Sequence, residues 1–546
     1  MGGFSAVNDD ILQNILFRLP ASSFASAACV RKSWNRVCNR VMAYPKLASA
    51  MSLNPSFPDA VREVLDKVLS GPIRPQFAIA SIGTQFSLEA AHQLISRKLG
   101  SKVPVVTSNA CGIIGRDAIT NTMQEVRWRN MPEEDGPISQ ESDKFNRGIV
   151  LIVGYLPGLM VDAIPLLRLK TVTLLPLPNF LLIEVHSNCN NKVANDPQFS
   201  LIDRFLKEIK NYTAHVSGLI EPDGIIMFGD QNVDMTPVLA EIDCVMSEET
   251  VIVGDASSRF ICNSGHNSHH YDSDLYFFDA VALVFAKDKN KPQGIGETRF
   301  HSTLSAGLVP FGPELRAISV ASKGTECSWI TVSMNGFPQL IDSQRLLDDI
   351  NRELNDENAE MYIGVIQKRP SSIEQEKMEM RKYLAFYDVL GGDDEYLVIE
   401  GVGIQPGDTF LFYHADSSTA RSSCLNAFEK FKVLRPASSS RNPWSRANAG
   451  AAQVVGGGKG GVFGGLMFSS HYRGEAYYDS FPIYGNFRGV PIAGLVCSKE
   501  IGRDSATSSV WQEAKEESPA RCSLHVCTSV YLVLSYIPPT PNLDIN

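Results

Sequence analysis

The first forty residues carry two apolar stripes with helical spacing. The first recurs at positions i, i+1, i+4, i+5 and i+8, which places its side chains on one face of a helix. Its members are Ile11, Leu12, Ile15, Leu16 and Leu19. Asn8 can cap this helix, Asp9 and Asp10 add negative charge to its first turn, and Pro20 ends it.

A second stripe alternates between spacings of three and four, and either Ser22 or Ser23 can cap its helix. Its members are Ala27, Val30, Trp34, Val37 and Val41. About forty residues cannot bury two such stripes by themselves, so the pattern predicts a partner. A helical hairpin that packs on the rest of the chain is the alternative.

From residue 76 onward, short β-rich runs alternate with helical ones. Expected strands are 76–83, 103–109, 148–154, 224–230, 251–255, 280–286, 395–400, 409–414, 465–468, 492–497 and 524–534. Expected helices are 87–99, 161–168, 201–210, 346–355 and 373–381. Strand–helix–strand spacing of about thirty residues implies α/β layers.

The expected fold class is α+β overall, with a small all-α head followed by a two-part α/β body. We assign the head to residues 1–50, a linker to 51–75, and the two α/β parts to 76–345 and 346–540. Residues 436–461 are rich in Ser, Ala and Gly and are expected to form a flexible loop. The chain shows no tandem repeat, so a leucine-rich repeat array is not expected.

Charge divides the head from the body. The chain carries a formal charge of −10, of which residues 1–50 hold +4 and the remainder −14. A basic head suits an acidic partner, and an acidic body argues against binding to nucleic acid.

The sequence shows no targeting segment, because the N-terminus lacks an apolar core. The longest apolar run, residues 149–167, is interrupted by Pro157, Asp162 and Pro165, so a membrane span is not expected. The eleven cysteines form no Cys-x-x-Cys pair. Reduced thiols in the cytoplasm or nucleus are therefore predicted.

The head resembles the F-box family. Arg18-Leu19-Pro20 follows Ile15-Leu16, and Val30-x-Lys-x-Trp34 follows at the family's spacing. Val7-Asn8 stands where Leu-Pro usually opens the motif, and Arg31 replaces a Cys. The resemblance implies docking on a Skp-type adaptor, and thereby on a cullin. The implied contact residues are Ile11, Leu12, Ile15, Leu16, Leu19, Pro20, Val30 and Trp34.

Residues 464–474 and 490–502 resemble the C-terminal FIST domain, whose signature is Gly-x-Leu-x-Phe-x-Cys-x-x-Arg-Gly and then Pro-x-x-Gly-Phe-x-x-x-Gly-Glu-Ile. The matching residues are Gly464, Leu466, Phe468, Arg473, Gly474, Pro491, Gly494, Glu500 and Ile501. Ser470, Leu495 and Lys499 replace the usual Cys, Phe and Gly. Residues 107–112 resemble the small-residue turn of the N-terminal FIST domain.

FIST domains are regarded as sensory or signal-transduction modules, with amino acids proposed as ligands. The resemblance makes Arg473, Gly474 and Glu500 candidates for a small-ligand site. A buried Arg473–Glu500 ion pair with a purely structural role is the alternative interpretation.

Catalytic and metal motifs are not supported. Residues 456–461 are Gly-rich around a Lys, but the Gly and the Ser or Thr that a phosphate loop needs are missing. Residues 262–274 contain Cys, His and Asp at no standard zinc spacing. Cys262 and Cys327 could be redox sensors, with buried inert thiols as the alternative. We expect no catalytic residue, no metal and no cofactor.

The sequence therefore predicts a non-catalytic substrate receptor of an SCF-type ubiquitin ligase. Its head would bind the adaptor, and its body would recruit a target protein for ubiquitination and proteasomal degradation. The alternative is a small-ligand sensory protein whose N-terminal helices merely pack on the body.

Overall fold

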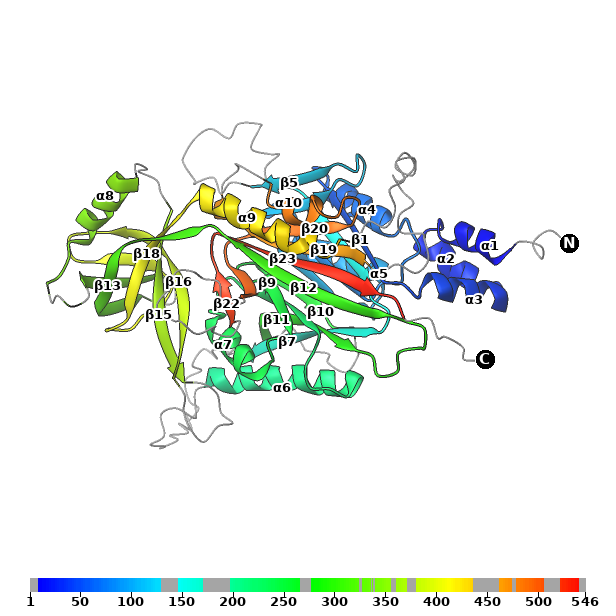
Figure 1. The fold of residues 1–546 in the computed structure, drawn as a ribbon, viewed down its shortest axis with the longest axis horizontal. Helices are drawn as coiled ribbons and strands as arrows, with labels where there is room; N and C mark the ends of the chain where they lie inside the picture. Colours follow the sequence, from blue (N-terminus) through cyan, green and yellow to red (C-terminus); the bar gives the residue numbers. More distant parts are fainter. Residues whose placement is uncertain are drawn as a thin grey trace, which may run out of the picture.

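The structure is a computed structural model. It describes residues 8–128, 146–169, 197–265, 276–323, 327–334, 336, 339–354, 360–370, 380–435, 461–473, 478–504 and 521–539. A helical head lies at one end and a β-barrel at the other, with three sheets between them (Figure 1). No helix in these ranges is long and apolar enough to cross a membrane.

The head consists of three short helices and leads directly into the first sheet. The helices are α1 (Asp9–Leu16), α2 (Ala21–Ala28) and α3 (Lys32–Val41). The five strands of the first sheet, in spatial order, are β1 (Lys46–Ser52), β6 (Ile149–Tyr155), β2 (Phe77–Ile82), β3 (Val105–Asn109) and β10 (Phe260–Asn263). Helices α4 (Phe57–Val68) and α5 (Leu88–Leu99) cover its outer face.

The second sheet has six strands and is covered by α6 (Pro197–Ser217) and α7 (Thr236–Val245). Its strands, in spatial order, are β22 (Arg521–His525), β21 (Glu500–Asp504), β9 (Val251–Asp255), β8 (Gly224–Gly229), β11 (Tyr276–Lys287) and β7 (Leu159–Leu169).

The third sheet also has six strands, and α9 (Ser417–Lys432) and α10 (Phe481–Tyr484) pack on it. Its strands, in spatial order, are β12 (Glu297–Ala306), β23 (Thr528–Ile537), β19 (Gly461–Ser470), β20 (Ile492–Cys497), β4 (Gly112–Arg116) and β5 (Met123–Arg127). Each sheet contains one parallel strand pair joined through a helix: β2–α5–β3, β8–α7–β9 and β19–α10–β20.

The remaining strands close into a barrel beside α8 (Ser343–Leu354). In spatial order they are β13 (Leu308–Lys323), β14 (Cys327–Met334), β17 (Leu397–Glu400), β16 (Met380–Gly392), β15 (Met361–Pro370) and β18 (Thr409–Ala415). The sequence pattern predicted α/β layers in the body and did not predict this antiparallel barrel.

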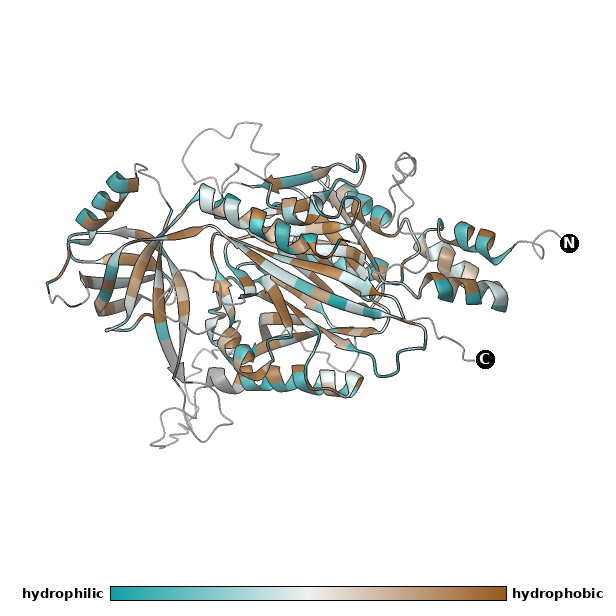
Figure 2. Ribbon diagram, in the orientation of Figure 1, coloured by the Kyte–Doolittle hydropathy of each residue, from teal (hydrophilic) through white to brown (hydrophobic). Residues whose placement is uncertain are grey.

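One face of each sheet lies in a single shared core, which appears as brown strands at the centre of Figure 2. Phe77 of the first sheet meets Phe285 of the second edge to face, with ring centroids 5.1 Å apart. Phe228 of the second sheet meets Phe468 of the third at 6.1 Å. Such pairs add about 0.5–1.5 kcal/mol each beyond their burial, so aromatic packing joins all three sheets.

The structural units differ from the expected domain boundaries. The barrel uses strands from both sides of residue 345, and β4 of the third sheet pairs with β20 from the C-terminal part. Residues 51–75, expected to be a linker, form α4, whose apolar side chains pack on the first sheet. The helical spacing of Ala60, Val64 and Val68 explains this packing.

Residues 161–168 are a strand and not the expected helix. They form most of β7, which is an edge strand that pairs only with β11 among the described residues. Pro165 is tolerated there, because an edge strand can leave a backbone position without a donor. A second difference lies at 524–534, where Cys527 adopts a positive φ of 49° and separates β22 from β23. The expected helix at 373–381 lies outside the described residues up to 379, and 380–381 begin β16.

Acidic side chains gather where the barrel meets the second sheet. Burial raises the pKa of Asp388 to about 7, and the neighbouring Glu400 and Glu360 carboxylates act in the same direction. Burial also raises the pKa of Glu360 to about 7. The facing cation is Lys499, whose Nζ lies 4.0 Å from Oε1 of Glu400. Asp388 and Glu360 therefore change their protonation state near neutral pH.

We expect Asp388→Asn to stabilise the protein above pH 7. A carboxyl whose folded pKa is raised from about 4 to about 7 contributes stability at pH 4 that is lost as the pH rises to 7. The amide cannot ionise, so the gain at pH 8 should reach about 1 kcal/mol or more. Thermal unfolding midpoints from pH 4 to pH 8 test this, with exposed Asp394→Asn as the control. Parallel curves for Asp388→Asn and wild type would contradict it.

Candidate functional site

The head has a small apolar core of its own. Leu12 and Leu16 from α1 are buried against Phe24 of α2 and against Val37 and Val41 of α3. As expected, the Asn8 side chain caps α1 by accepting a hydrogen bond from the backbone N–H of Asp10. The three helices therefore use only part of the predicted apolar stripes.

The rest of the first stripe faces outward. Ile11 is 56% exposed and Ile15 is 46% exposed, and Val30 in the turn between α2 and α3 is 62% exposed. Pro20 is exposed, while Leu19 and Trp34 are half-buried. The predicted contact set is therefore split: Leu12 and Leu16 build the head, and the remaining residues leave apolar surface for a partner.

The second predicted helix is two helices. It breaks at residues 29–31, so Val30 does not share a face with Val37 and Val41. Pro20 occupies the N-cap position of α2, and Ser22 and Ser23 lie inside the helix. The fixed φ of proline suits the start of a helix, and this accounts for the earlier beginning.

Several direct contacts fix the head to the body. The backbone N–H of Ala21 donates to the carbonyl of Leu69, at 3.0 Å. Nζ of Lys46 donates to the Pro72 carbonyl at 2.6 Å and lies 4.9 Å from the ring centre of Phe17. Burial lowers the pKa of Lys46 to about 8. The hydroxyl of Tyr536 on β23 also donates to the carbonyl of Ala43, at 3.2 Å.

The carboxyl ends of parallel strands from all three sheets meet at one place, which we call the strand junction. The backbone N–H of Cys111, after β3, donates to the carbonyl of Val496 on β20 at 2.8 Å. The N–H of Ala256, after β9, donates to the carbonyl of Lys499 at 2.9 Å. Carboxyl ends of parallel strands are where α/β proteins commonly place ligands, so this junction is the second candidate site.

Arg473 anchors one side of the strand junction. Its side chain is fully buried, and Nε lies 3.1 Å from Oδ1 of Asp479. Nη2 donates to the hydroxyl of Ser305 at 2.7 Å. Asp479 also pairs with Arg127 on β5 and accepts from the hydroxyl of Ser469 at 2.6 Å. One buried carboxylate therefore compensates two guanidinium groups.

The predicted Arg473–Glu500 ion pair is not formed. Arg473 pairs with Asp479, and it reaches Glu500 only as a nearby charge that lowers the carboxyl pKa. Gly474, the third predicted ligand residue, lies outside the described residues. Asp479 and Arg127 were not predicted, because they lie more than 340 residues apart and carry no local motif.

Glu500 and Asp255 form the other side of the strand junction, and both are fully buried. Burial and the nearby Asp255 raise the pKa of Glu500 well above its usual value. Oε1 of Glu500 accepts a hydrogen bond from the thiol of Cys497 at 3.6 Å, while Oε2 has no hydrogen-bond partner within the described ranges. Burial raises the pKa of Asp255 to about 6, although the hydroxyls of Ser257 and Ser258 donate to it.

The described residues give no support to a reactive Cys262 thiol or to a metal site. Burial raises the pKa of the Cys262 thiol to about 12, which keeps it protonated and unreactive. Across the ranges that the structure describes, no group of three or more His, Cys, Asp or Glu is placed to hold a metal ion. Most of the His-containing run falls in residues 266–275, outside those ranges.

We expect Asp479→Ala to destabilise the protein by about 3–5 kcal/mol, because it leaves Arg473 buried without its counter-ion. Glu500→Gln is the matched control in the same junction. Burial raises the pKa of Glu500 and so favours its uncharged form, which an amide resembles, and the free energy of unfolding should change by less than about 1 kcal/mol. Denaturant unfolding at pH 7 measures both, and equal losses would contradict the assignment of Asp479 as the central charge.

One comparison with known proteins bears on the family of this chain. No family model matches the chain. The chain is 34% identical over 546 residues to an F-box/LRR-repeat protein of Arabidopsis thaliana, and the alignment covers 97% of this chain and 93% of that protein. The described elements of this chain form sheets and a barrel and not stacked repeats.

Proposed function

The chain belongs to the F-box protein family, and we propose that it is the substrate-recognition subunit of an SCF-type (Skp–cullin–F-box) ubiquitin ligase. The head docks on a Skp-type adaptor and through it on a cullin. The body recruits a target protein for ubiquitination and proteasomal degradation, and the chain itself is non-catalytic. The observation that carries this proposal is the exposure of three apolar side chains of the head: Ile11 and Ile15 on α1, and Val30 in the turn between α2 and α3.

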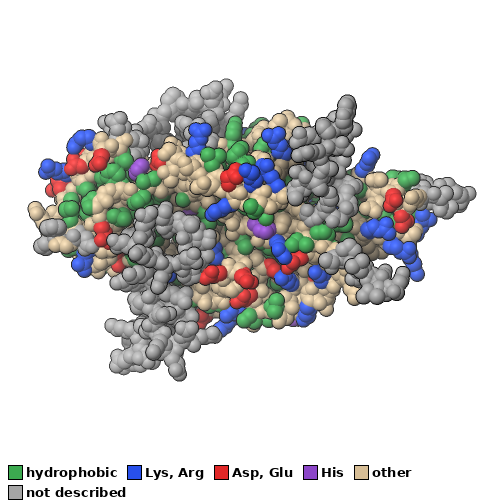
Figure 3. Space-filling view, in the orientation of Figure 1, with side chains coloured by type: hydrophobic (Ala, Val, Ile, Leu, Met, Phe, Trp, Pro, Cys, Tyr) green, Lys and Arg blue, Asp and Glu red, His purple; other side chains and the backbone are tan. Residues whose placement is uncertain are grey.

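Exposed apolar side chains gain free energy only when a partner covers them. Complete burial of an exposed isoleucine side chain contributes about 1.5–3 kcal/mol, and these three side chains are about half exposed, so covering them contributes about 2–5 kcal/mol to adaptor binding. Apolar, basic and acidic side chains all lie on the face of the head seen in Figure 3. Its net charge of +4 over residues 1–50 favours rapid association with an acidic adaptor.

The joint between head and body supports the same role. The hydrogen bond from Ala21 to Leu69 ties the head to the end of α4, and the contact between Lys46 and the Phe17 ring ties it to β1. A substrate receptor must hold its target at a set distance from the ligase, and a head that is packed on the body meets this requirement without a flexible linker.

We propose that the body consists of two FIST-like parts that select the target. The support is the pattern at 464–474 and 490–502, whose described residues fall mainly on β19, on β20 and on the start of β21. We also propose that the protein acts in the cytoplasm or nucleus. The cysteines of the described chain are free thiols, which suits a reducing compartment.

We expect the double variant Ile11→Asp with Ile15→Asp to lose at least about tenfold in affinity for a purified Skp-type adaptor. Both side chains are exposed, so the head should keep its fold while its apolar contact is removed. Isothermal titration calorimetry measures the affinity, and circular dichroism verifies folding.

The matched control is Ile119→Asp, which changes an isoleucine that is 74% exposed and lies outside the head. It should leave adaptor affinity unchanged. Full affinity in the Ile11/Ile15 double variant would count against docking through these two side chains.

A second candidate function is a small-ligand sensor, and it is favoured by Oε2 of Glu500, which is buried without a hydrogen-bond partner among the described residues. Such a sensor should show a saturable rise in its thermal midpoint with one amino acid of a twenty-member panel. Glu500→Gln should abolish the rise. Saturable stabilisation without adaptor binding would favour the sensor over the ligase subunit. An unchanged thermal midpoint with every amino acid of the panel would rule out the amino-acid sensor.

A further inference from the structure

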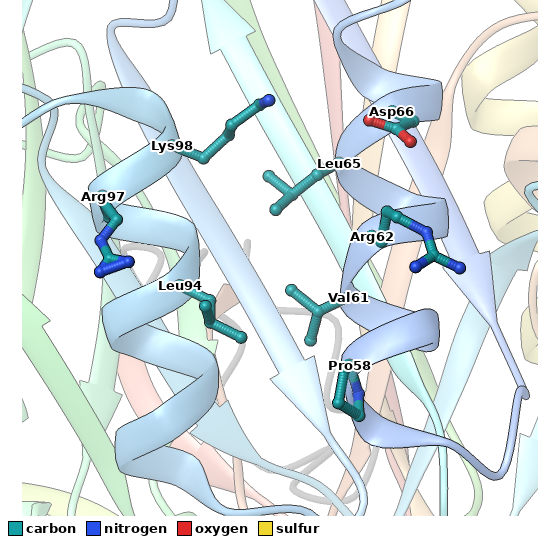
Figure 4. Close-up of a pocket in the computed structure, with 8 residues that line it drawn as sticks. All are labelled: Pro58, Val61, Arg62, Leu65, Asp66, Leu94, Arg97 and Lys98. Atoms are coloured by element: carbon teal, nitrogen blue, oxygen red, sulfur yellow. The ribbon is translucent and has the colours of Figure 1, made fainter.

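Helices α4 and α5 leave an apolar groove between them on the outer face of the first sheet (Figure 4). Its volume is about 360 Å³, at the lower end of ligand pockets, which span about 300–1,000 Å³. Val61 and Leu65 of α4 form one wall, and Leu94 of α5 points toward them from the other side. Leu94 is 39% exposed, so the groove presents apolar surface to solvent.

Positive charge exceeds negative charge along this apolar surface, because Arg62, Arg97 and Lys98 line the groove and Asp66 is the one acidic residue of that lining. Lys98 reaches across one end of the groove, and Arg97 precedes it on α5 (Figure 4). Neither forms an ion pair with any residue that the structure describes, whereas Arg62 on α4 is paired with Asp59 at 2.5 Å. The sequence outside residues 1–50 carries a net charge of −14, so two unpaired cations beside an apolar groove do not follow from composition.

We propose that the α4–α5 groove binds a short segment of the recruited target protein, in which a branched apolar side chain lies next to one or two acidic residues. The apolar side chain would pack among Val61, Leu65 and Leu94, and the carboxylates would meet Arg97 and Lys98. This proposal rests on the proposed function, because it names the chemistry by which a ligase subunit selects its target.

The position of the groove suits this role. The chain leaves α4 at Val68, and the next residue, Leu69, accepts the hydrogen bond from Ala21 that ties the body to the head. A segment held between α4 and α5 is therefore carried by a helix directly anchored to the adaptor-binding head. The barrel lies at the opposite end of the molecule (Figure 1).

The test pans a phage-displayed library of random 12-residue peptides against the purified full chain. We expect enriched sequences to contain Leu, Ile or Val beside Asp or Glu. Labelled copies of the enriched peptides should bind Leu94→Asp, and separately the double variant Arg97→Glu with Lys98→Glu, at least about tenfold more weakly than wild type. Fluorescence polarisation measures these affinities.

Two control variants repeat these kinds of substitution outside the groove. Ile119→Asp places a carboxylate on an exposed apolar residue elsewhere, and Lys102→Glu reverses an exposed charge just beyond α5. Both should bind the peptides as wild type does. Enriched peptides without acidic residues, or equal binding by Leu94→Asp, would overturn the proposal. A wild-type dimer that Leu94→Asp dissociates, seen by sedimentation, would assign the groove to a second copy of the chain and also overturn it.

Adaptor affinity measured on the same variants separates this proposal from the proposed function. Retained adaptor binding with no peptide selection rejects the groove and leaves the ligase assignment intact. Peptide selection that depends on Leu94 and Lys98 without any adaptor binding supports the groove as a peptide site and rejects the ligase assignment.

Discussion

The structure depends on three sheets that bury one face each against a common core. Phe77, Phe285, Phe228 and Phe468 come from all three sheets and meet edge to face within it. None of the sheets can bury its apolar inner face alone, so the three sheets are stable only when they pack together. The same constraint brings the carboxyl ends of β3, β9 and β20 to one point and creates the strand junction with its buried charges. The outer faces are left to helices, and the space between α4 and α5 is part of that outer layer.

Local sequence patterns were sufficient for much of this architecture. The strand at 251–255 and the helix at 87–99 lie where their apolar periodicity predicted them, and the structure makes Ser87, the first residue of that range, the N-cap of α5. The helix predicted at 161–168 was wrong because a continuous apolar run does not distinguish an edge strand from a buried helix. Pro165 did not decide between the two. The barrel was missed because its closure depends on which strands pair, and pairing across residue 345 leaves no local signal.

The candidate sites show the same limit. The F-box pattern located the head and the family assignment agrees with it, but periodicity could not say which side of the α1 stripe a partner would meet. Leu12 and Leu16 turned inward to build the head's own core, and Ile11 and Ile15 remained outside. In the junction, Arg473 was recognised as a buried cation, yet its counter-ion was misassigned. Asp479 is only six residues away in the sequence, but no local pattern marked it as the partner of Arg473.

The place of β23 in the third sheet has a consequence for biosynthesis. This strand lies between β12 and β19, although it ends at Ile537, close to the end of the chain. The head therefore leaves the ribosome long before β23, and the apolar inner face of the third sheet stays without complete cover until β23 has been synthesised. A chain that stops before β23 would have a complete head joined to a body whose third sheet is not closed and whose apolar core is exposed.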